Sequence, residues 1–363
     1  MFKSLPRPTR FSIKSTCERY MSLSRLHALS SQLIKPTMAS QSTMESHARD
    51  WETFFKEDKF VNQYKTGEHI TGQFAKRLID QSGLVANSKA NPDTPLVVLD
   101  NACGTGIVSS ILQQELDDQV KKNLKLTCGD ISQGMLDYVK HRIGEENWQN
   151  VEVKVVDAQD SGLPSSHFTH VIASFVFMAL PNSLAALDDT TRILQPGGTI
   201  ALSTWIEPGW LSVTQKAIET IPGNLPFPTA HQFLEALGTG KWHSVPWIQS
   251  QLQERGFEDI SVRSVTTNMS IKVPNFVEMT MLMFGMVSKV FWTEKQREED
   301  TAKVRPALEK YLVSTYGKEG DIPMEWTAIL STALYFDMGP NNESLRRKQI
   351  TKYENAGKII KTN

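Results

Sequence analysis

The chain contains 363 residues, of which 40% are hydrophobic and 22% are charged, and its formal net charge is −1. This composition excludes a wholly disordered chain, and the near-neutral charge argues against a nucleic-acid partner. No apolar run approaches the roughly 20 residues of a membrane span, and three scattered cysteines cannot form a disulfide framework. We therefore expect an intracellular enzyme or binding domain, in the cytoplasm.

Residues 1–40 carry seven Lys or Arg residues and a single acid, Glu18. A basic, serine-rich and acid-poor start resembles a mitochondrial transit peptide, which would make the location mitochondrial instead. A disordered tail, or an upstream extension of a protein that starts at Met38 or Met44, explains the composition equally well. In each case we expect residues 1–44 to be a leader outside the fold.

Residues 45–338 are expected to form one domain, followed by a tail at 339–363. Aromatic and apolar residues from Trp51 to Tyr64 have helical spacing, and a further helix should end near Gly83. The polar segment 86–95, which contains two prolines, predicts a loop.

Short apolar runs then alternate with helical stretches. Strands are expected at 96–99, 124–128, 151–156, 170–176, 199–205, 260–265 and 326–335, and the helices include 106–116, 134–143, 183–193, 211–220 and 245–255. This alternation predicts a doubly wound, mainly parallel α/β sheet of seven strands. A helical insertion at about 275–320, between the last two strands, should lie over one edge of the sheet as a lid.

The segment Leu-Asp100-Asn101-Ala102-Cys103-Gly104-Thr105-Gly106 lies between a predicted strand and a predicted helix. Its glycines allow close approach of a ligand to the backbone, and the helix start offers free N–H groups. A carboxylate at 100 would repel a pyrophosphate, and Ser109 stands where a dinucleotide fingerprint has a third Gly or Ala. The segment therefore favours a ligand that carries an amine and a carboxylate.

Two further acids follow the next two predicted strands. Asp130 is placed to accept from both hydroxyls of a ribose, and Asp157 from an adenine amino group. Ser174 and Phe175 end the fourth strand, and the carboxyl ends of parallel strands line one cleft. Each acid alone could instead cap the following helix, but three at successive strand ends, beside a glycine loop, make that explanation poor.

Together, Asp100-x-Ala-x-Gly-x-Gly, Asp130, Asp157-Ala158 and Leu194-Gln-Pro-Gly-Gly-Thr resemble the class I S-adenosylmethionine-dependent methyltransferases. The resemblance is strong over 95–205 and extends over 50–340 by element order. It implies a Rossmann-like fold and S-adenosylmethionine as cofactor. Ala102 departs from the commoner Gly. The implied cofactor-binding residues are Tyr64, Asp100, Asn101, Ala102, Gly104, Gly106, Asp130, Ile131, Met135, Asp157, Ala158, Ser174 and Phe175.

The residues of the glycine loop (Asn-Ala-Cys-Gly-Thr-Gly) and the late helical insertion are most similar to those of fungal small-molecule methyltransferases, including those that S-methylate the dithiol of gliotoxin. We expect a small hydrophobic acceptor, although the methionine stripe at 279–286 also fits plain core packing. The expected acceptor pocket contains Phe177, Met178, Trp205, Met283 and Phe284.

No catalytic base centred on His and no metal site are predicted. His167 and His170 are read as surface or turn histidines, and His69 is the one histidine expected near the cofactor. A thiol acceptor needs no strong base, which favours S-methylation of a secondary metabolite. Methylation of O, N or C in a polyketide or quinone, and a cofactor-binding regulatory protein of secondary metabolism, remain as alternatives.

Overall fold

The computed structural model describes residues 65–336, so the expected leader, the helical segment 51–64 with Tyr64, and the tail 339–363 lie outside the described residues. The strands are β1 (Leu96–Asn101), β2 (Leu124–Asp130), β3 (Val151–Val155), β4 (Phe168–Ser174), β5 (Leu194–Glu207), β6 (Phe257–Lys272) and β7 (Asp321–Tyr335). The helices are η1 (Lys65–Gly67), α4 (Glu68–Ser82), α5 (Leu84–Ala90), α6 (Ile107–Glu115), α7 (Asp118–Lys122), α8 (Gln133–Glu145), η2 (Phe177–Ala179), α9 (Ser183–Ile193), α10 (Trp210–Ile218), α11 (Ala230–Leu237), α12 (Val245–Glu254), α13 (Val273–Phe291) and α14 (Glu294–Tyr316).

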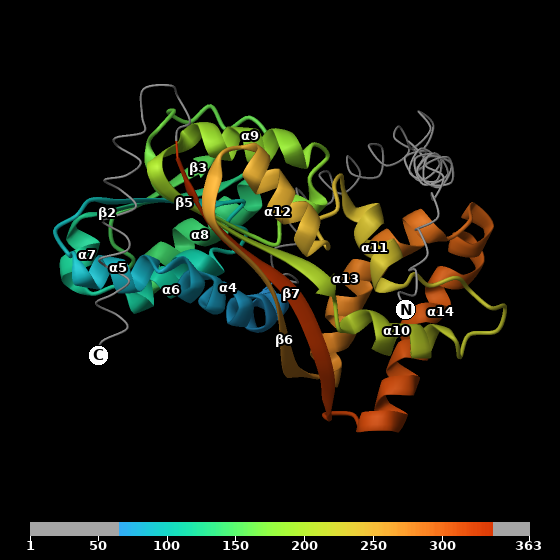
Figure 1. Cartoon of the computed structure of the whole chain (residues 1–363). Coiled ribbons are helices and arrows are strands. Elements are labelled where there is room, and N and C mark those ends of the chain that lie inside the picture. Colours follow the sequence, from blue (N-terminus) through green and yellow to red (C-terminus); the bar gives the residue numbers. More distant parts are fainter. Residues whose placement is uncertain (1–64, 337–363) are drawn as a thin grey trace, which may run out of the picture. The chain divides into compact units, whose positions relative to one another are not determined.

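The seven strands form one sheet in the order β3-β2-β1-β4-β5-β7-β6 (Figure 1). β1 to β5 are parallel, and β7 runs antiparallel to both of its neighbours. The predicted mainly parallel, seven-stranded α/β sheet is therefore confirmed. Because β1 lies between β2 and β4, the direction of strand order reverses there, and the carboxyl ends of these strands border the natural ligand crevice.

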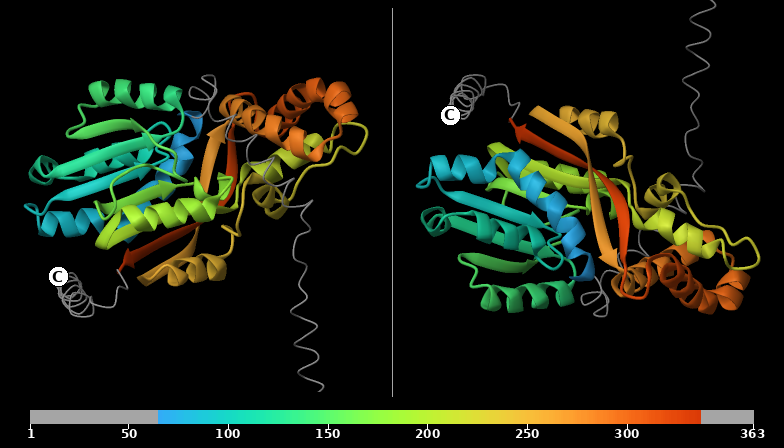
Figure 2. Two further views of the ribbon diagram at one scale, coloured as in Figure 1. Left: turned by 90° about the horizontal axis from the view of Figure 1, so that it is seen from above. Right: turned by 90° about the horizontal axis from the view of Figure 1, so that it is seen from below.

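Helices cover both faces of the sheet, as a parallel sheet requires. α4 packs against β5 and β7, and α12 packs against β6 and β7. The two views in Figure 2 show α4 on one face and α9 and α12 on the other. Phe74 and Leu78 of α4 are fully buried, so this helix belongs to the core.

The last two strands extend beyond the end of β5. Glu207 of β5 pairs with Thr327, whereas the pairing of β6 with β7 continues from Thr267–Trp326 to Lys272–Asp321. This two-stranded ribbon leads into α13 and α14, which pack on each other and on α10 at one end of the domain (Figure 1). We call α10, α13 and α14 the helical cap.

The prediction of a loop at 86–95 is wrong for its first half, because α5 extends to Ala90. Gly83 ends α4 in the left-handed conformation (φ 70°), and the fully buried Leu84 then starts a second short helix. α7 and α11 are two further helices that were not predicted from the sequence. α11 had a readable signal, because Thr229 and Gln232 form a capping box at its start.

Candidate active site

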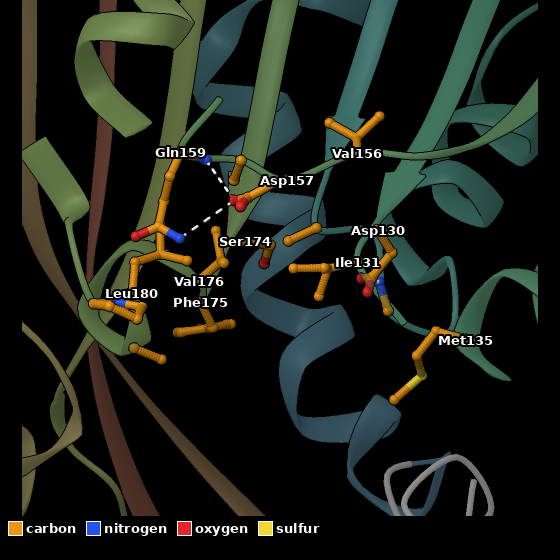
Figure 3. Close-up of a pocket in the computed structure, with 15 residues that line it drawn as sticks. Asp130, Ile131, Met135, Val156, Asp157, Gln159, Ser174, Phe175, Val176 and Leu180 are labelled. Atoms are coloured by element: carbon orange, nitrogen blue, oxygen red, sulfur yellow. Dashed lines mark hydrogen bonds between the residues drawn. The ribbon is translucent and has the colours of Figure 1, made fainter. Parts of the chain in front are cut away.

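A pocket enclosing about 810 Å³, with its open mouth included, lies at the carboxyl ends of the parallel strands (Figure 3). Segments after β1, β2, β3 and β4 contribute to it. Its lining brings together nine of the predicted cofactor residues, which are Ala102, Gly104, Asp130, Ile131, Met135, Asp157, Ala158, Ser174 and Phe175. The other lining residues are Val156, Gln159, Val176, Ala179, Leu180 and Pro181.

Asp130 holds the turn between β1 and α6 against the end of β2. Its Oδ2 accepts a hydrogen bond from the backbone N–H of Gly104 at 2.8 Å, and its Oδ1 accepts from the N–H of Ser132 at 2.9 Å. Burial raises the pKa of Asp130, against the opposing effect of these hydrogen bonds. Each carboxylate oxygen has two lone pairs, so both oxygens can still accept from a ligand in the pocket.

Asp100 lies behind the pocket and does not line it. Its Oδ2 accepts from the backbone N–H of Ser109 at 3.1 Å and from the Ser109 hydroxyl at 2.6 Å, both within α6. The side chain is 1% exposed. Burial raises its pKa to about 7, although the bonds from Ser109 act in the opposite direction. Asp100 therefore fastens α6 to β1, and sequence analysis missed Ser109 as its partner.

The turn from β1 into α6 needs unusual backbone angles. Ala102, Gly104 and Gly106 have φ values of 55°, 54° and 81°. A Cβ atom on Gly106 would lie 3.0 Å from the Trp148 ring. Gly106 thus shapes the turn without lining the pocket, and Ala102 occupies a conformation that favours glycine.

We expect Gly106→Ala to lower the free energy of unfolding by about 1–3 kcal/mol, because it adds backbone strain and a contact with Trp148. Gly144→Ala is the matched control. Gly144 lies in helix α8 with nothing within 4 Å of an added Cβ, so this change should be neutral or stabilising by up to about 1 kcal/mol. Urea denaturation measures both, and equal stability of the two variants would contradict the strained turn.

Two buried oxygen atoms of the same turn have no hydrogen-bond partner within residues 65–336. They are Oδ1 of Asn101 and Oγ1 of Thr105. Unpaired buried polar atoms are costly in a folded protein, so they are reasonable positions for contacts with a ligand or with ordered water. Neither residue lines the pocket in the present side-chain arrangement.

Asp157 and Gln159 form the upper part of the pocket in Figure 3. β3 ends at Val155, so Asp157 lies in the loop two residues later. Its Oδ1 accepts from the backbone N–H of Gln159 at 2.9 Å and from the Gln159 side chain at 3.3 Å. Gln159 Oε1 accepts in turn from Asn182 N–H at 2.7 Å. No sequence motif identifies Gln159, because its position depends on the hydrogen bond from Asn182, which lies in a later loop.

Arg142 connects the glycine turn to the start of α4. Its Nη1 donates to the carbonyl oxygen of Thr105 at 3.0 Å and to Oε1 of Glu68 at 3.0 Å. The guanidinium also lies 5.7 Å from the centre of the Trp148 ring. This contact fixes the first turn of α4 beside the loop, and sequence analysis did not identify it.

An aromatic group stands beside the pocket. The ring of Phe175, which lines the pocket, stacks on Trp205 with centroids 3.9 Å apart, and Phe74 packs edge-on against Trp205 at 5.2 Å. Phe177 and Met178 lie in the core next to this aromatic group. Phe177 packs on Trp242 at 5.0 Å, and the Met178 sulfur accepts from the Trp205 N–H. The structure therefore places neither of them along the pocket.

The two residues predicted from α13 have different surroundings. Phe284 is fully buried in the helical cap, where its ring packs on Trp292 at 4.9 Å. Met283 is only partly buried. α13 also contacts η1, which precedes α4. Phe284 thus belongs to the packing of the cap, while Met283 is available on its surface.

His69, His167 and His170 do not line the pocket. His167 is exposed before β4, as predicted, whereas His170 lies inside β4. Burial lowers the pKa of His170 to about 4. His69 is an exposed residue in the first turn of α4. Among the residues of 65–336 that line the pocket, only Asp130 and Asp157 carry titratable side chains.

This sheet order, with a glycine turn and acids at the strand ends, defines a methyltransferase fold, and comparison with known proteins agrees. Residues 98–198 match the methyltransferase-domain family. The chain is 41% identical over 281 residues to methyltransferase tpcH of Aspergillus fumigatus, covering 77% of this chain and 98% of the relative. It is also 41% identical over 279 residues to the acetylaranotin bis-thiomethyltransferase of Aspergillus terreus, with coverage of 77% and 95%.

A solved structure, the Haemonchus contortus phosphoethanolamine N-methyltransferase 2 in complex with S-adenosyl-L-methionine, is 17% identical. It covers 78% of this chain and 60% of that chain with a TM-score of 0.42. From the sequence relatives, the chain belongs to the methyltransferase family and is an enzyme of methyl transfer. Within residues 65–336, none of the helices has the length and apolar character that a membrane crossing needs.

Proposed function

We propose that this enzyme transfers a methyl group from S-adenosylmethionine to the thiols of a small hydrophobic secondary metabolite, with a dithiol as the preferred acceptor. One observation carries the choice of acceptor: in the described part of the chain, the only titratable side chains that line the pocket are the carboxylates of Asp130 and Asp157. With so few groups available to remove a proton from the acceptor, the acceptor must already be a good nucleophile. A thiol with its ordinary pKa near 8.5 is a few per cent thiolate at neutral pH.

The residues present fit S-adenosylmethionine. Asp130 offers two carboxylate oxygens to the ribose hydroxyls, and Asp157 offers a carboxylate to the adenine amino group. Ile131, Val156 and Ala158 supply an apolar surface for the adenine ring.

When bound, S-adenosylmethionine supplies a methyl group on a positively charged sulfur. The contribution of the chain is then to hold the acceptor in line and to exclude water. Phe175 and Trp205 provide an apolar wall for this purpose, and α13, with Met283, is the segment that we propose as a lid over the acceptor.

The proposal of a dithiol draws support from the Aspergillus terreus relative, whose name states that it is a bis-thiomethyltransferase acting on acetylaranotin. The similarity covers 95% of that protein, and an acceptor of similar chemistry is therefore the one that we propose.

The pH dependence of the chemical step tests the thiol directly. With a thiol acceptor whose pKa is close to that of cysteine, about 8.5, the rate should rise about tenfold per pH unit and level off at that pKa. A phenol with a pKa near 10 is ionised about thirty-fold less at pH 7 and should react correspondingly more slowly. His69→Ala should leave this profile unchanged. Loss of turnover in His69→Ala, with both ligands still bound, would show that a general base is required.

Met283→Asp tests the role of α13. A charge on the surface that meets the acceptor should raise the acceptor KM about tenfold while the affinity for S-adenosylmethionine stays within about twofold. Val313→Asp on α14 is the control, because Val313 is an exposed apolar residue of the same cap. If both variants keep the original KM, α13 does not cover the acceptor site.

A further inference from the structure

Three metal-binding side chains meet on the surface outside the pocket. His231 and Glu235 lie one turn apart on α11, and His243 lies in the segment that leads to α12. One ligand atom from each lies within 4.8 Å of the other two. The rings of the two histidines pack edge-on with centroids 4.8 Å apart. Within residues 65–336, no other group of three such residues has this spacing.

Both parts of the cluster are firmly supported. The Thr229–Gln232 capping box fixes the start of α11 directly beside His231. On the other side, the residue before His243 is Trp242, which is 1% exposed and whose carbonyl oxygen accepts from the Thr204 hydroxyl at 2.7 Å. The two backbone segments are therefore held in place by the core, while the ligating side chains reach solvent.

We propose that His231, Glu235 and His243 bind a divalent transition-metal ion such as Zn²⁺. Two imidazoles and one carboxylate form a set that Zn²⁺ uses with a water as its fourth ligand. Tetrahedral Zn²⁺ with bonds of 2.0–2.1 Å separates its ligand atoms by about 3.3 Å. His231 Nε2 and Glu235 Oε1 are already 3.4 Å apart, and a ligand atom of the partly buried His243 lies within 4.8 Å of both residues.

The charges around the cluster suit this role. A neutral imidazole keeps a lone pair that it can share with a metal ion. Glu235 supplies the negative charge that a dication requires.

A metal here would brace one wall of the pocket. The segment between the ligands includes Thr239, whose N–H donates to the Leu180 carbonyl at 3.2 Å and whose carbonyl accepts from the Ser183 hydroxyl at 2.7 Å. Leu180 lines the pocket. The ion would thus link α11 to the loop that supports Leu180, a structural role that is independent of the acceptor proposed above.

Full-length protein without a purification tag, first treated with a chelator, is titrated with Zn²⁺ by calorimetry and with Co²⁺ by visible absorption. We expect one ion per chain with micromolar affinity, Co²⁺ bands of a site with nitrogen ligands, and a higher melting temperature with Zn²⁺. His243→Ala should weaken binding by at least about tenfold, because one of three ligands is lost.

His141→Ala is the matched control. His141 and Glu145 form an exposed pair one turn apart on α8, with Nδ1 and Oε2 at 3.3 Å, and the described residues offer no third ligand there. This variant should bind Zn²⁺ as the original protein does. Absence of saturable binding up to about 1 mM Zn²⁺, or equal binding by His243→Ala and the original protein, would overturn the proposal.

Discussion

Replacing Asp130 by alanine should weaken the binding of S-adenosylmethionine by roughly 30- to 150-fold. In the proposed binding mode the carboxylate accepts from both ribose hydroxyls, and loss of charge-assisted hydrogen bonds costs about 2–3 kcal/mol. Part of the lost affinity should come from a change in the turn between β1 and α6, because Asp130 Oδ2 also accepts a hydrogen bond from the N–H of Gly104 in that turn. Calorimetric titration with S-adenosylmethionine measures the change.

Two further variants separate these contributions. Asp130→Asn retains an acceptor oxygen and should lose less affinity than Asp130→Ala. Asp137→Ala removes an exposed acid of the neighbouring helix α8 and should leave the affinity unchanged. If Asp130→Ala is folded and binds the cofactor normally, Asp130 is not part of the site and the proposed position of the ribose is wrong.

Asp100→Asn should remove a large part of the pH dependence of stability. The unfolded carboxyl titrates near 3.9, and burial raises its folded pKa to about 7. An acid with a raised folded pKa stabilises the protein when protonated, so this contribution is present at low pH and is lost as pH rises from about 4 to 7. Three pKa units correspond to about 4 kcal/mol.

Urea denaturation between pH 5 and 8 tests this sign. Relative to the original protein, Asp100→Asn should become more stable with rising pH by about 3 kcal/mol over this range, because asparagine stays neutral and still accepts from Ser109. Asp130 also has a raised pKa, so some dependence should remain in the variant. Asp137→Asn, which changes an exposed acid, is the control. A constant difference between Asp100→Asn and the original protein would show that Asp100 ionises normally in the folded state.

The sheet and the position of the pocket were predictable from the sequence because both depend on local patterns. The apolar run of β1 indicates a strand buried on both faces, and acids at strand ends must meet at one edge of a parallel sheet. Ala102, Asp130 and Asp157 line the pocket for this reason. The direction in which each side chain points is harder to predict. Asp100 looks equivalent to Asp130 in the sequence, but it faces α6 and Ser109.

The helical cap shows where a sequence pattern is insufficient. Met283 and Phe284 are adjacent in an apolar helix, and both kinds of surroundings, core and pocket, favour such residues. Phe284 is fully buried and packs on Trp292, whereas Met283 is only partly buried. Ser109 is a similar case: its departure from a glycine pattern was visible, whereas its hydrogen bonds to Asp100 depend on tertiary structure.

The most direct test of thiol methylation uses one acceptor that carries an alkyl thiol and a phenol in the same small apolar molecule. The enzyme is incubated with S-adenosylmethionine under reducing conditions, and mass spectrometry locates the added methyl group. We predict the S-methyl product, with one S-adenosylhomocysteine formed per methyl group, and a bis-S-methyl product when a dithiol replaces this acceptor. Methylation of the phenol oxygen while the thiol remains free would contradict the proposed function.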